Sequence, residues 1–594
     1  MTKSELPRLY EFGPFRLDAE ARTLTREGRP VALTPKAFDT LLELVRSGGR
    51  VMERDELIRR VWPDSFVEEG NLKVTIFMLR RALEEDAAEP RLIQTVPRRG
   101  YRFASEVVET SGPAETSEGA RGGQPRAGDA TSPIAVLPFK LLAAGGADDY
   151  LGLGLADALI VRLSKLRQVV VRPTSAVRRY TSPHQDPVVA GRELRVAAVL
   201  DGNIHRSGDR VRVTAQLLNV ETGAALWAGK FDADFTDIFA VEDSISEQAA
   251  RSLAPELTGE DRRQLAKRHT ENVAAYKLYL KGRYHWAKRT SEGIRRAGEF
   301  FRAAVDLDPN YAPAYTGLAD FYAQLGWLRL LRPADALPKA RAAAQKALEL
   351  DETLAEAHTS LAWARMIYDW EWAEADEGFR RAVDLNPNYA VAPLWRSVYF
   401  IATGRFEEAA AASARALELD PLSPIANAVA GWPFYFMRRY DRAIEHYRRA
   451  LEIEPDNFPA LFLLGHAYRQ SGELSASVEK LQLARTLLDG PLPLAGLGHA
   501  YAAAGDARGA RKILRELERL SKERYVCPYD VAGIHAGLGE RDEAFKYLER
   551  ACEERSSWLI FLAVEPGLDA LRADPRFADL LRRIGLHPQT DEKH

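Results

Sequence analysis

Short phrases recur in the C-terminal half of this 594-residue chain at a nearly constant spacing. Val-Asp-Leu-Asn-Pro at 383–387, Leu-Glu-Leu-Asp-Pro at 417–421 and Leu-Glu-Ile-Glu-Pro at 451–455 place their prolines 34 positions apart, and Val-Asp-Leu-Asp-Pro at 305–309 has the same form. A fixed period of roughly 20–50 residues indicates a repeat architecture, in which each unit contacts its neighbours along the array. This pattern therefore constrains the chain from about residue 270 onward to a stack of similar helical units.

The period and the residue types within it are those of the tetratricopeptide (TPR) repeat, a pair of antiparallel helices. Small residues such as Gly431 recur where two helices approach, and aromatic residues such as Tyr447 recur where a seam must be filled. One unit is longer, because Asp308 and Asp351 occupy equivalent positions 43 residues apart, which places about nine additional residues near 327–335. The sequence predicts about eight repeats, ending near residue 555, and then a helical cap.

The first helix of each pair lines the concave groove of such an array. Repeat register assigns a set of mostly apolar and aromatic residues to this groove, with a few polar groups among them. Such a surface suits a peptide or a helix of a partner protein. The alternative is that these residues pack against the inner turn of the array itself or against the preceding domain. The predicted groove residues are Val391, Leu394, Val398, Ile425, Trp432, Tyr435, Phe462, His466, Arg469 and His499.

The N-terminal hundred residues carry a basic hairpin directly behind an amphipathic helix. Gln-Thr-Val-Pro-Arg-Arg-Gly-Tyr-Arg-Phe at 94–103 predicts two strands around an Arg-Arg-Gly turn. Apolar residues at helical spacing predict a helix over 69–85, preceded by helices that follow Thr34 and Arg54 and by a small antiparallel sheet over 10–31. A helix that enters the major groove beside such a hairpin, or wing, is how a winged helix-turn-helix binds DNA. The inner stripe of the helix is Leu72, Ile76, Leu79 and Leu83.

Four stretches resemble the OmpR/PhoB-type winged-helix effector domain of bacterial transcription regulators, and the resemblance covers nearly all of residues 8–105. It implies that the helix over 69–85 reads bases, that the wing contacts the minor groove, and that the loop 62–70 contacts RNA polymerase or serves transactivation. Because the chain begins almost at the first strand, we expect no receiver domain, as in the one-component ToxR/CadC group but without a membrane helix. The stretches are Leu33-Thr-Pro-Lys-Ala-Phe, Arg54-Asp-Glu-Leu-Ile-Arg-Arg-Val-Trp, Leu79-Arg-Arg-Ala-Leu and the hairpin at 94–103.

The resemblance also assigns candidate DNA contacts. Asparagine can pair with adenine through two hydrogen bonds, and valine or threonine methyl groups can meet the thymine methyl group. Arginine and lysine can bind phosphates or enter the minor groove. Phe77, Met78 and Pro97 stand where the family commonly has basic residues, which puts the identity of the bases read in doubt. The alternative is that the basic residues form an ordinary solvated face. The candidates are Asn71, Val74, Thr75 and Met78 for bases, Lys73, Arg80, Arg81, Arg98 and Arg99 for phosphates or the minor groove, and Tyr101 beside them.

Two further regions separate the N-terminal domain from the repeats. Residues 107–132 are rich in Gly, Ser, Thr, Ala, Glu and Pro, which predicts a flexible linker. Residues 133–257 alternate predicted strands and helices and resemble the TolB-like or FlgO-like α/β domain, on the segments that begin at Ile134, Tyr150 and Leu217. Gly152-x-Gly154 at a helix start lacks the third glycine of a dinucleotide site, because Asp157 stands there. We therefore favour a rigid sensor or spacer module over a nucleotide site.

Composition limits the remaining possibilities. The formal net charge of −3 is close to neutral, so a basic surface must be local. Cys527 and Cys552 are the only cysteines, which favours a reducing compartment, and neither a signal peptide nor an apolar run of membrane-spanning length is visible, so we expect a cytoplasmic protein without membrane contact. Eleven scattered histidines and the absence of GxxxxGK[ST], HExxH, CxxC and GxSxG motifs predict no metal, no cofactor and no enzymatic activity.

The sequence thus predicts a multidomain, mostly α-helical protein. It would comprise a winged helix-turn-helix domain (α+β) over 1–106, the linker 107–132, the α/β domain 133–257 and a TPR α-solenoid over 270–590. The predicted function is that of a sequence-specific, one-component regulator of bacterial transcription whose TPR body binds a protein partner or signal. Expected partners are double-stranded DNA, RNA polymerase, a protein or peptide in the groove, and a second copy of the chain. The alternative is a TPR scaffold protein in which the winged helix mediates protein contacts.

Overall fold

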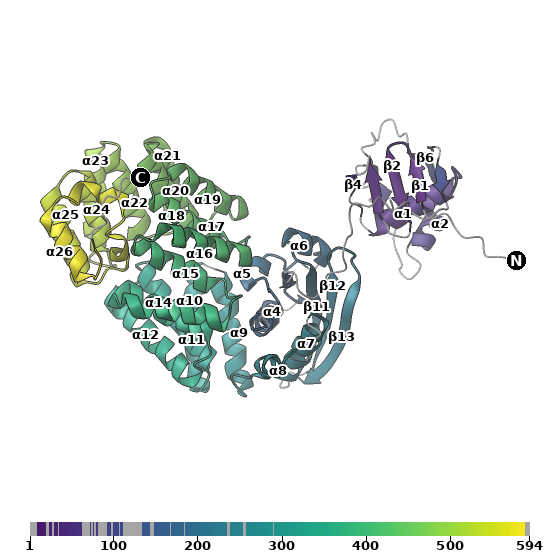
Figure 1. Cartoon of the computed structure of the whole chain (residues 1–594), viewed down its shortest axis with the longest axis horizontal. Coiled ribbons are helices and arrows are strands. Elements are labelled where there is room, and N and C mark those ends of the chain that lie inside the picture. The colour runs from purple at the N-terminus through teal and green to yellow at the C-terminus, as the bar shows by residue number, and fades with distance from the viewer. Residues whose placement is uncertain are drawn as a thin grey trace. The chain divides into compact units, whose positions relative to one another are not determined.

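The computed structural model describes residues 9–587, except 20–22, 27–28, 32, 34, 62–71, 73–74, 77–78, 81–82, 84–91, 97–98, 106, 111–132, 143–147, 167, 183, 209, 235–237, 254–256 and 289. The chain divides into two compact units, Met1–Gly128 and Asp129–His594, which we call the head and the body. Figure 1 shows strands and short helices in the head and mostly helices in the body. In the described part of the chain, no helix has both the length and the apolar character needed to span a membrane.

The head contains the small sheets and helices that the sequence predicts. One sheet has the strand order β4-β3-β2-β1-β8 and the other the order β5-β7-β6. Strand β8 pairs antiparallel with β1 and covers an edge that would otherwise expose unpaired backbone groups, so residues 108–110 belong to the head and the predicted start of the linker at 107 is wrong. The elements are β1 (Leu9–Phe12), β2 (Phe15–Asp18), β3 (Thr23–Arg26), β4 (Arg29–Val31), α1 (Pro35–Arg46), β5 (Met52–Glu53), α2 (Arg54–Val61), β6 (Ile93–Val96), β7 (Gly100–Phe103) and β8 (Val108–Thr110).

The body begins with an α/β domain, which we call the central domain. Its sheet has the order β10-β11-β12-β13, with β9 and β10 parallel to β11 and the last three strands antiparallel. The three long strands β11, β12 and β13 pair antiparallel in chain order, and Val171 forms an isolated parallel bridge with Ile134. The elements are β9 (Ile134–Val136), β10 (Lys140–Leu141), α4 (Tyr150–Leu163), α5 (Thr174–Val177), α6 (Pro187–Glu193), β11 (Ala198–Ser207), β12 (Arg210–Asn219), β13 (Ala225–Asp234), α7 (Ile238–Leu253) and α8 (Gly259–Ala266).

The two glycines of the Gly152-x-Gly154 pair have packing roles. A Cβ atom on Gly152 would lie 2.1 Å from the carbonyl oxygen of Phe139, so only glycine permits this close backbone approach. A Cβ atom on Gly154 would lie 3.3 Å from Leu280, on a helix that lies side by side with α4. Close packing therefore accounts for both glycines.

Eight helix pairs follow within the described residues between Val273 and Glu553, and Figure 1 shows them stacked along the body. The pairs are α9 (Val273–Ala287) with α10 (Ser291–Leu307), α11 (Ala312–Trp327) with α12 (Pro333–Leu350), α13 (Ala355–Ala364) with α14 (Trp372–Leu385), α15 (Val391–Ala402) with α16 (Phe406–Leu419), α17 (Pro424–Ala430) and α18 (Trp432–Phe436) with α19 (Tyr440–Ile453), α20 (Phe458–Ser471) with α21 (Leu474–Leu487), α22 (Pro491–Ala503) with α23 (Ala507–Leu520), and α24 (Pro528–Gly537) with α25 (Arg541–Glu553). A π-helical turn η2 (Arg365–Asp369) extends α13. Two 3₁₀ turns, η3 (Ser557–Phe561) and η4 (Pro566–Leu571), and helix α26 (Pro575–Arg583) complete the chain.

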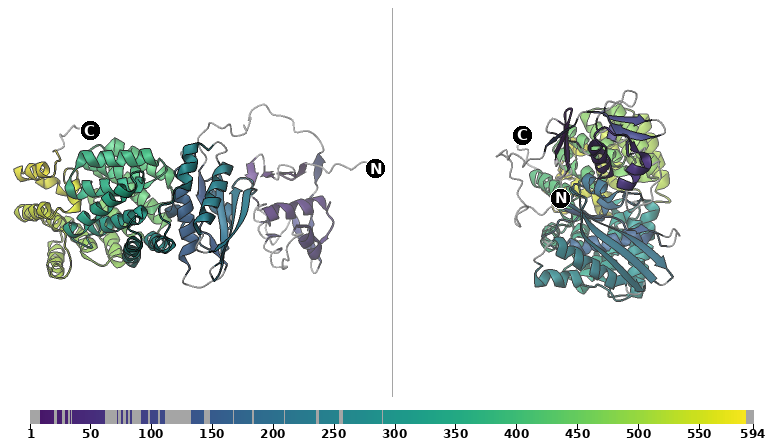
Figure 2. Two further views of the ribbon diagram at one scale, coloured as in Figure 1. Left: turned by 90° about the horizontal axis from the view of Figure 1, so that it is seen from below. Right: turned by 90° about the vertical axis from the view of Figure 1, so that its right-hand side faces the viewer.

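The central domain lies against one end of the array, as the views in Figures 1 and 2 agree. The polar residue that follows the second helix makes these contacts in five successive repeats, three times with the central domain and twice with the segment between α8 and the first repeat. In four of them this residue is the one before the recurring proline, so the sequence period also marks the docking surface. The contacts join Asp308 to Thr270, Asp351 to Lys267, Asn386 to Ser164, Asp420 to Ser175 and Glu454 to Arg178.

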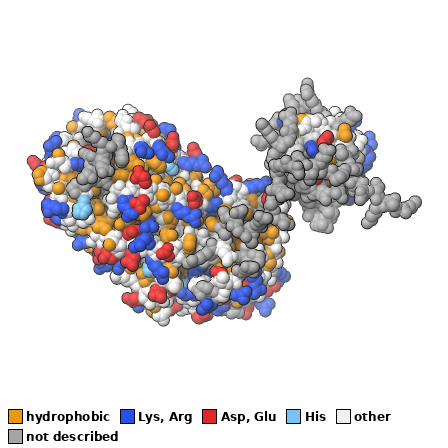
Figure 3. Space-filling view, viewed as in Figure 1, with side chains coloured by type: hydrophobic (Ala, Val, Ile, Leu, Met, Phe, Trp, Pro, Cys, Tyr) orange, Lys and Arg blue, Asp and Glu red, His pale blue; other side chains and the backbone are white. Residues whose placement is uncertain are grey.

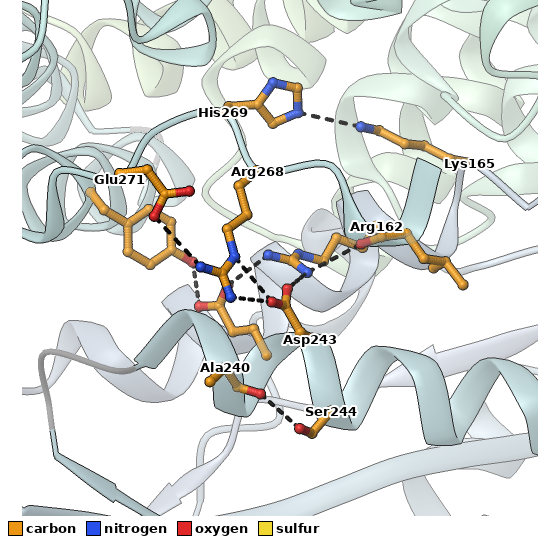
Figure 4. A network of polar contacts seen from close by, with 11 residues as sticks. Arg162, Lys165, Ala240, Asp243, Ser244, Arg268, His269 and Glu271 are labelled. Atoms are coloured by element: carbon orange, nitrogen blue, oxygen red, sulfur yellow. Dashed lines mark hydrogen bonds and ion pairs between the residues drawn. The ribbon is translucent and has the colours of Figure 1, made fainter. Parts of the chain in front are cut away.

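A charged network strengthens this junction (Figure 4). Asp243 on α7 lies between two arginines and binds both Arg162 and Arg268. Glu242, its neighbour, is 1% exposed, accepts a hydrogen bond from Tyr276 of the first repeat, and lies 3.6 Å from Arg162. Burial raises the pKa of Glu242 to about 7, against the attraction of Arg162, which favours the ionised form.

We expect the Glu242→Gln variant to gain stability relative to the wild type as the pH rises. A carboxyl group whose pKa is raised in the folded state takes up a proton on folding, so its stabilising contribution is full at low pH and is lost as the pH rises toward 7. Glutamine resembles the protonated form and does not titrate. Urea unfolding at pH 5 and pH 8 should therefore show a relative gain of about 2 kcal/mol for the variant.

The matched control is Glu247→Gln on the same helix. Glu247 pairs with Arg251, and both side chains are more than half exposed. Its replacement should show little change in relative stability between the two pH values. An equal response of the two variants would contradict the assignment of the buried proton to Glu242.

Candidate DNA interface and the interior of the repeat array

The predicted recognition helix packs its apolar stripe into the head. Leu72, Ile76, Leu79 and Leu83 are each less than 5% exposed, as the sequence predicts. Thr75 is 9% exposed, so its expected outward position is wrong. The reason is its spacing, since Thr75 follows Leu72 by three residues and precedes Leu79 by four and so shares their face of the helix. The candidates Asn71, Lys73, Val74, Met78, Arg81 and Arg98 lie outside the described residues.

Two of the remaining candidates are tied into the head. The Arg80 guanidinium donates from Nη2 to the carbonyl oxygen of Ile93 at 2.8 Å and to Thr95 Oγ1 at 2.8 Å, which joins the helix to strand β6. Tyr101 is 5% exposed and belongs to the core, so its expected place at the interface is wrong. Alternate residues of a strand point to one face, and Tyr101 shares the inner face of β7 with Phe103. Both residues position the wing relative to the helix.

The wing itself keeps positive charge on its surface. Arg99, in the turn between β6 and β7, is exposed, and its guanidinium has no hydrogen bond or ion pair with any described residue. Arg102 is also exposed, and its guanidinium donates to Gln94 Oε1 at 2.7 and 2.9 Å, a neutral partner that leaves the charge uncompensated. By contrast, Arg60 on α2 is paired with Glu43 and Glu56. A turn with an unpaired arginine suits a phosphate or the minor groove.

The structure brings together six of the ten predicted groove residues. They line a cavity of about 60 Å³ formed by the first helices of the last four repeats. Sequence register alone does not reveal Arg329, which reaches this cavity from the loop after α11 and forms an ion pair with Asp530 of α24 at 2.9 Å. The six residues are Trp432, Tyr435, Phe462, His466, Arg469 and His499.

The chain's own C-terminal segment, residues 557–571, fills much of the predicted groove. Trp558 of η3 stacks on Trp327 at 5.4 Å, and Phe561 stacks on Phe436 at 4.9 Å. Glu565, just before η4, accepts a hydrogen bond from the Tyr435 hydroxyl at 3.1 Å. The array therefore packs its concave face against residues that follow the repeats, a segment that neither the predicted function nor its alternative named.

The other four predicted groove residues do not line the cavity. Leu394 and Val398 are 4% and 0% exposed within the body core, so their predicted exposure to a partner is wrong. The reason is that α15 contacts η3. Val391 and Ile425, at the starts of α15 and α17, remain half-buried and do not line the cavity.

The cavity contains titratable groups whose charges depend on burial. Burial and the nearby charge of Arg469 lower the pKa of His466 well below its ordinary value and that of His499 to about 3, so both rings are neutral near pH 7. His499 Nε2 lies 2.8 Å from the carbonyl oxygen of Asp530. Burial raises the pKa of the Asp530 carboxyl group, and Arg329 opposes that shift. The fixed charges that remain are the two arginines and the carboxylates of Asp530 and Glu565.

Comparison with protein families divides the chain in the same way. Residues 28–103 match the family "Transcriptional regulatory protein, C terminal", residues 130–248 match "HilA/YgeH-like transcriptional regulator, second domain", and residues 438–472 match "TPR repeat". The central domain is thus similar to the second domain of HilA-like regulators, and its likeness to TolB or FlgO stays a prediction. The matched regulator and TPR families are non-enzymatic.

Individual relatives cover different parts of the chain. Transcriptional regulator HilA of Salmonella typhi is 25% identical over 403 residues, which are 67% of this chain and 68% of that protein. Putative adenylate cyclase 3 of Rhizobium meliloti (strain 1021) is 28% identical over 249 residues, 40% of this chain and 42% of the relative. Sensory transduction protein RegX3 of Mycolicibacterium smegmatis is 41% identical over 96 residues, 16% of this chain and 42% of the relative. The chain therefore spans less than half the length of two of these three relatives.

The solved structures include the DNA-binding domain of Escherichia coli CadC, which is 31% identical, covers 18% of this chain and all of that one, and has a TM-score of 0.17. The chain carries an OmpR/PhoB-type winged-helix domain, a HilA-like regulator domain and TPR repeats, which together are the parts of a DNA-binding transcriptional regulator.

Proposed function

We propose that this protein binds specific promoter sequences through its head and regulates transcription without catalysing a reaction. The observation that carries the proposal is the wing, where Arg99 is exposed and unpaired within the described residues of a domain that matches a DNA-binding family. Figure 3 supports the assignment of DNA binding to the head and not to the body. On the visible face of the body, acidic and basic side chains are interspersed and form no single basic patch. We infer that the protein acts in the cytoplasm, where bacterial DNA lies.

A binding selection from fragmented bacterial genomic DNA tests this function. Full-length protein and residues 1–128 would be used in parallel. Enrichment of one motif by both supports a sequence-specific regulator, and a motif that recurs as spaced half-sites supports self-association on DNA. Enrichment by the head alone would show that the body masks it. If neither protein enriches any sequence in a salt-sensitive manner, the proposal is wrong.

Replacing Arg99 with alanine should weaken DNA binding about equally for all sequences. A phosphate contact releases counterions, so its loss should reduce the slope of log K against log salt concentration by about 1. Arg60→Ala is the matched control, because Arg60 is already paired with Glu43 and Glu56. Fluorescence anisotropy at several salt concentrations measures both slopes. An unchanged slope for Arg99→Ala would place the wing away from the phosphates.

Reversing the charge of the wing distinguishes DNA binding from the scaffold alternative. With Arg98 and Arg99 both replaced by glutamate, a DNA-binding head loses its salt-dependent affinity, whereas a head that serves only protein contacts keeps its partners. For the body, TPR repeats support a role in protein contacts. We further propose RNA polymerase as one partner, to be tested by binding of the purified polymerase before and after replacement of residues 62–70.

A further inference from the structure

The cavity inside the repeat array is bordered by an unusual set of buried polar groups. Tyr447, Tyr529 and Trp432 are 0%, 5% and 5% exposed and line it, as does Trp558 of the C-terminal segment. Among the described residues, the two tyrosine hydroxyls and the two indole N–H groups have no hydrogen-bond partner. A buried donor without a partner typically costs about 1–3 kcal/mol, and such groups are rare in folded proteins. Their gathering around one cavity indicates that something else accepts their hydrogen bonds.

The arginines beside this cavity add to the excess of donors. Arg469 Nε and Arg329 Nη1 are also buried without a hydrogen-bond partner in the described structure. Arg329 is neutralised by its ion pair with Asp530. Arg469 has no ion pair with any described residue, although the Glu565 carboxylate borders the same cavity, and its Nη2 lies 3.4 Å from His466 Nδ1. Arg469 is therefore the group in the cavity that most requires an anion.

Water molecules would satisfy these groups only in part. A water molecule can hydrogen-bond with the hydroxyls and the indole N–H groups, but it carries no charge and leaves the Arg469 guanidinium without an anion in contact with it. A carboxylate only accepts, through two oxygens, and binds a guanidinium with both. The rest of the wall is apolar, with Phe462 and Leu492 among its residues, and suits a short hydrocarbon portion.

We propose that the cavity between Arg469, Tyr447 and Tyr529 is a binding site for a small carboxylate of the size of acetate or propionate. The volume of about 60 Å³ is sufficient for a ligand of this size. Because Trp558 and Glu565 also border the cavity, the occupied site would link the last repeats to the C-terminal segment. This site is separate from the proposed DNA interface of the head. Experiments can therefore disprove the carboxylate site and the DNA-binding function independently.

Isothermal titration of the full-length protein with sodium acetate and sodium propionate tests this site, with acetamide as the neutral control of the same shape. The best affinity per atom of very small ligands limits the Kd of acetate, with its four heavy atoms, to roughly 0.05 mM, and we expect a Kd of about 1 mM. Arg469→Gln should weaken binding at least about tenfold, since it removes a charge-assisted pair. Acetamide should produce no binding heat in the same range.

Tyr447→Phe keeps the test decisive if Arg469→Gln disturbs the fold. In the ligand-free protein this change removes a hydroxyl that has no partner, so the melting temperature should stay the same or rise. The affinity for acetate should nevertheless fall about fivefold, the loss of one hydrogen bond. Tyr501→Phe, a tyrosine outside the cavity lining, should leave the affinity unchanged.

Three results would overturn the proposal. No heat from either carboxylate up to about 50 mM would show that the cavity holds only water, because ligands weaker than this have no useful affinity. Binding of acetamide as tightly as acetate would show that charge is not recognised. Equal affinity in the wild type, Arg469→Gln and Tyr447→Phe would place the bound carboxylate elsewhere on the protein.

Discussion

Gly100→Ala should unfold the head and abolish DNA binding while the body stays folded. A Cβ atom at this position would lie 1.9 Å from the carbonyl oxygen of Met52 and 2.9 Å from its carbonyl carbon. Both are backbone atoms of strand β5, which is paired with β7, so no side-chain rotation relieves the clash. Strand β7 is the central strand of its sheet and cannot move away from β5 without moving against β6. We expect a loss of about 3 kcal/mol or more.

Thermal unfolding of the full-length variant, followed by circular dichroism, measures this effect. The head and the body are separate compact units, so the transition of the head should move to lower temperature or disappear while that of the body is unchanged. Gly13→Ala is the matched control in the same domain. Gly13 has φ +53° and no atom within 4 Å of its Cβ position, so alanine there should cost only about 1–2 kcal/mol. A Gly100 variant with normal DNA affinity would show that strand β5 can move far enough to accept the added Cβ atom, which would contradict this prediction.

Asp157→Ala should strongly destabilise the body. Asp157 is 2% exposed on α4 of the central domain and forms an ion pair at 2.9 Å with Arg283 of the first repeat. It also accepts a hydrogen bond from Thr174. Removing the carboxylate leaves the half-buried Arg283 guanidinium without its partner, so we expect a loss of about 3 kcal/mol, the lower end of the range for a broken buried pair. Urea unfolding of the full chain, followed by tryptophan fluorescence, measures the loss.

A double variant distinguishes the cost of the unpaired charge from the cost of the lost packing. Asp157→Leu combined with Arg283→Met removes both charges and should recover most of the stability, because an apolar pair of similar volume can replace a buried ion pair. The control is the pair Arg212 and Asp232 on the surface of the central sheet, where both side chains are more than half exposed. Asp232→Ala should change the stability little, because solvent screens an exposed pair. Equal losses for Asp157→Ala and Asp232→Ala would contradict the structural role of the buried pair.

The sequence was most informative where a local period sets the structure. The 34-residue spacing predicts the repeat pairs because each pair has to present the same small and aromatic residues to its neighbours. The helical spacing of Leu72, Ile76 and Leu79 likewise predicts which face of the recognition helix is buried. The same rule, applied more strictly, would have placed Thr75 on that face, since its spacing to Leu72 and Leu79 is helical.

Contacts between distant segments could not be predicted in this way. The sequence contains Glu565, Trp558 and Arg329, but no period or motif relates them to Trp432 or Asp530, so the filled groove and its cavity escape sequence reasoning. The missing third glycine already disfavoured a nucleotide site at Gly152-x-Gly154, but only the positions of Phe139 and Leu280 gave both glycines a packing role. The end of the head was missed for the same reason, because strand β8 is defined by its pairing with β1 and not by its own residues.

The sequence by itself determined the three kinds of domain, their order and the basic wing, because propensity, turn residues and hydrophobic periodicity act over short stretches of chain. Only the tertiary structure decided what the interior of the array contains. The concave face buries its aromatic residues against segment 557–571 and leaves buried donors around a small cavity. Which surfaces a folded chain uses to cover one another depends on contacts between residues far apart in sequence, and such contacts leave no local pattern.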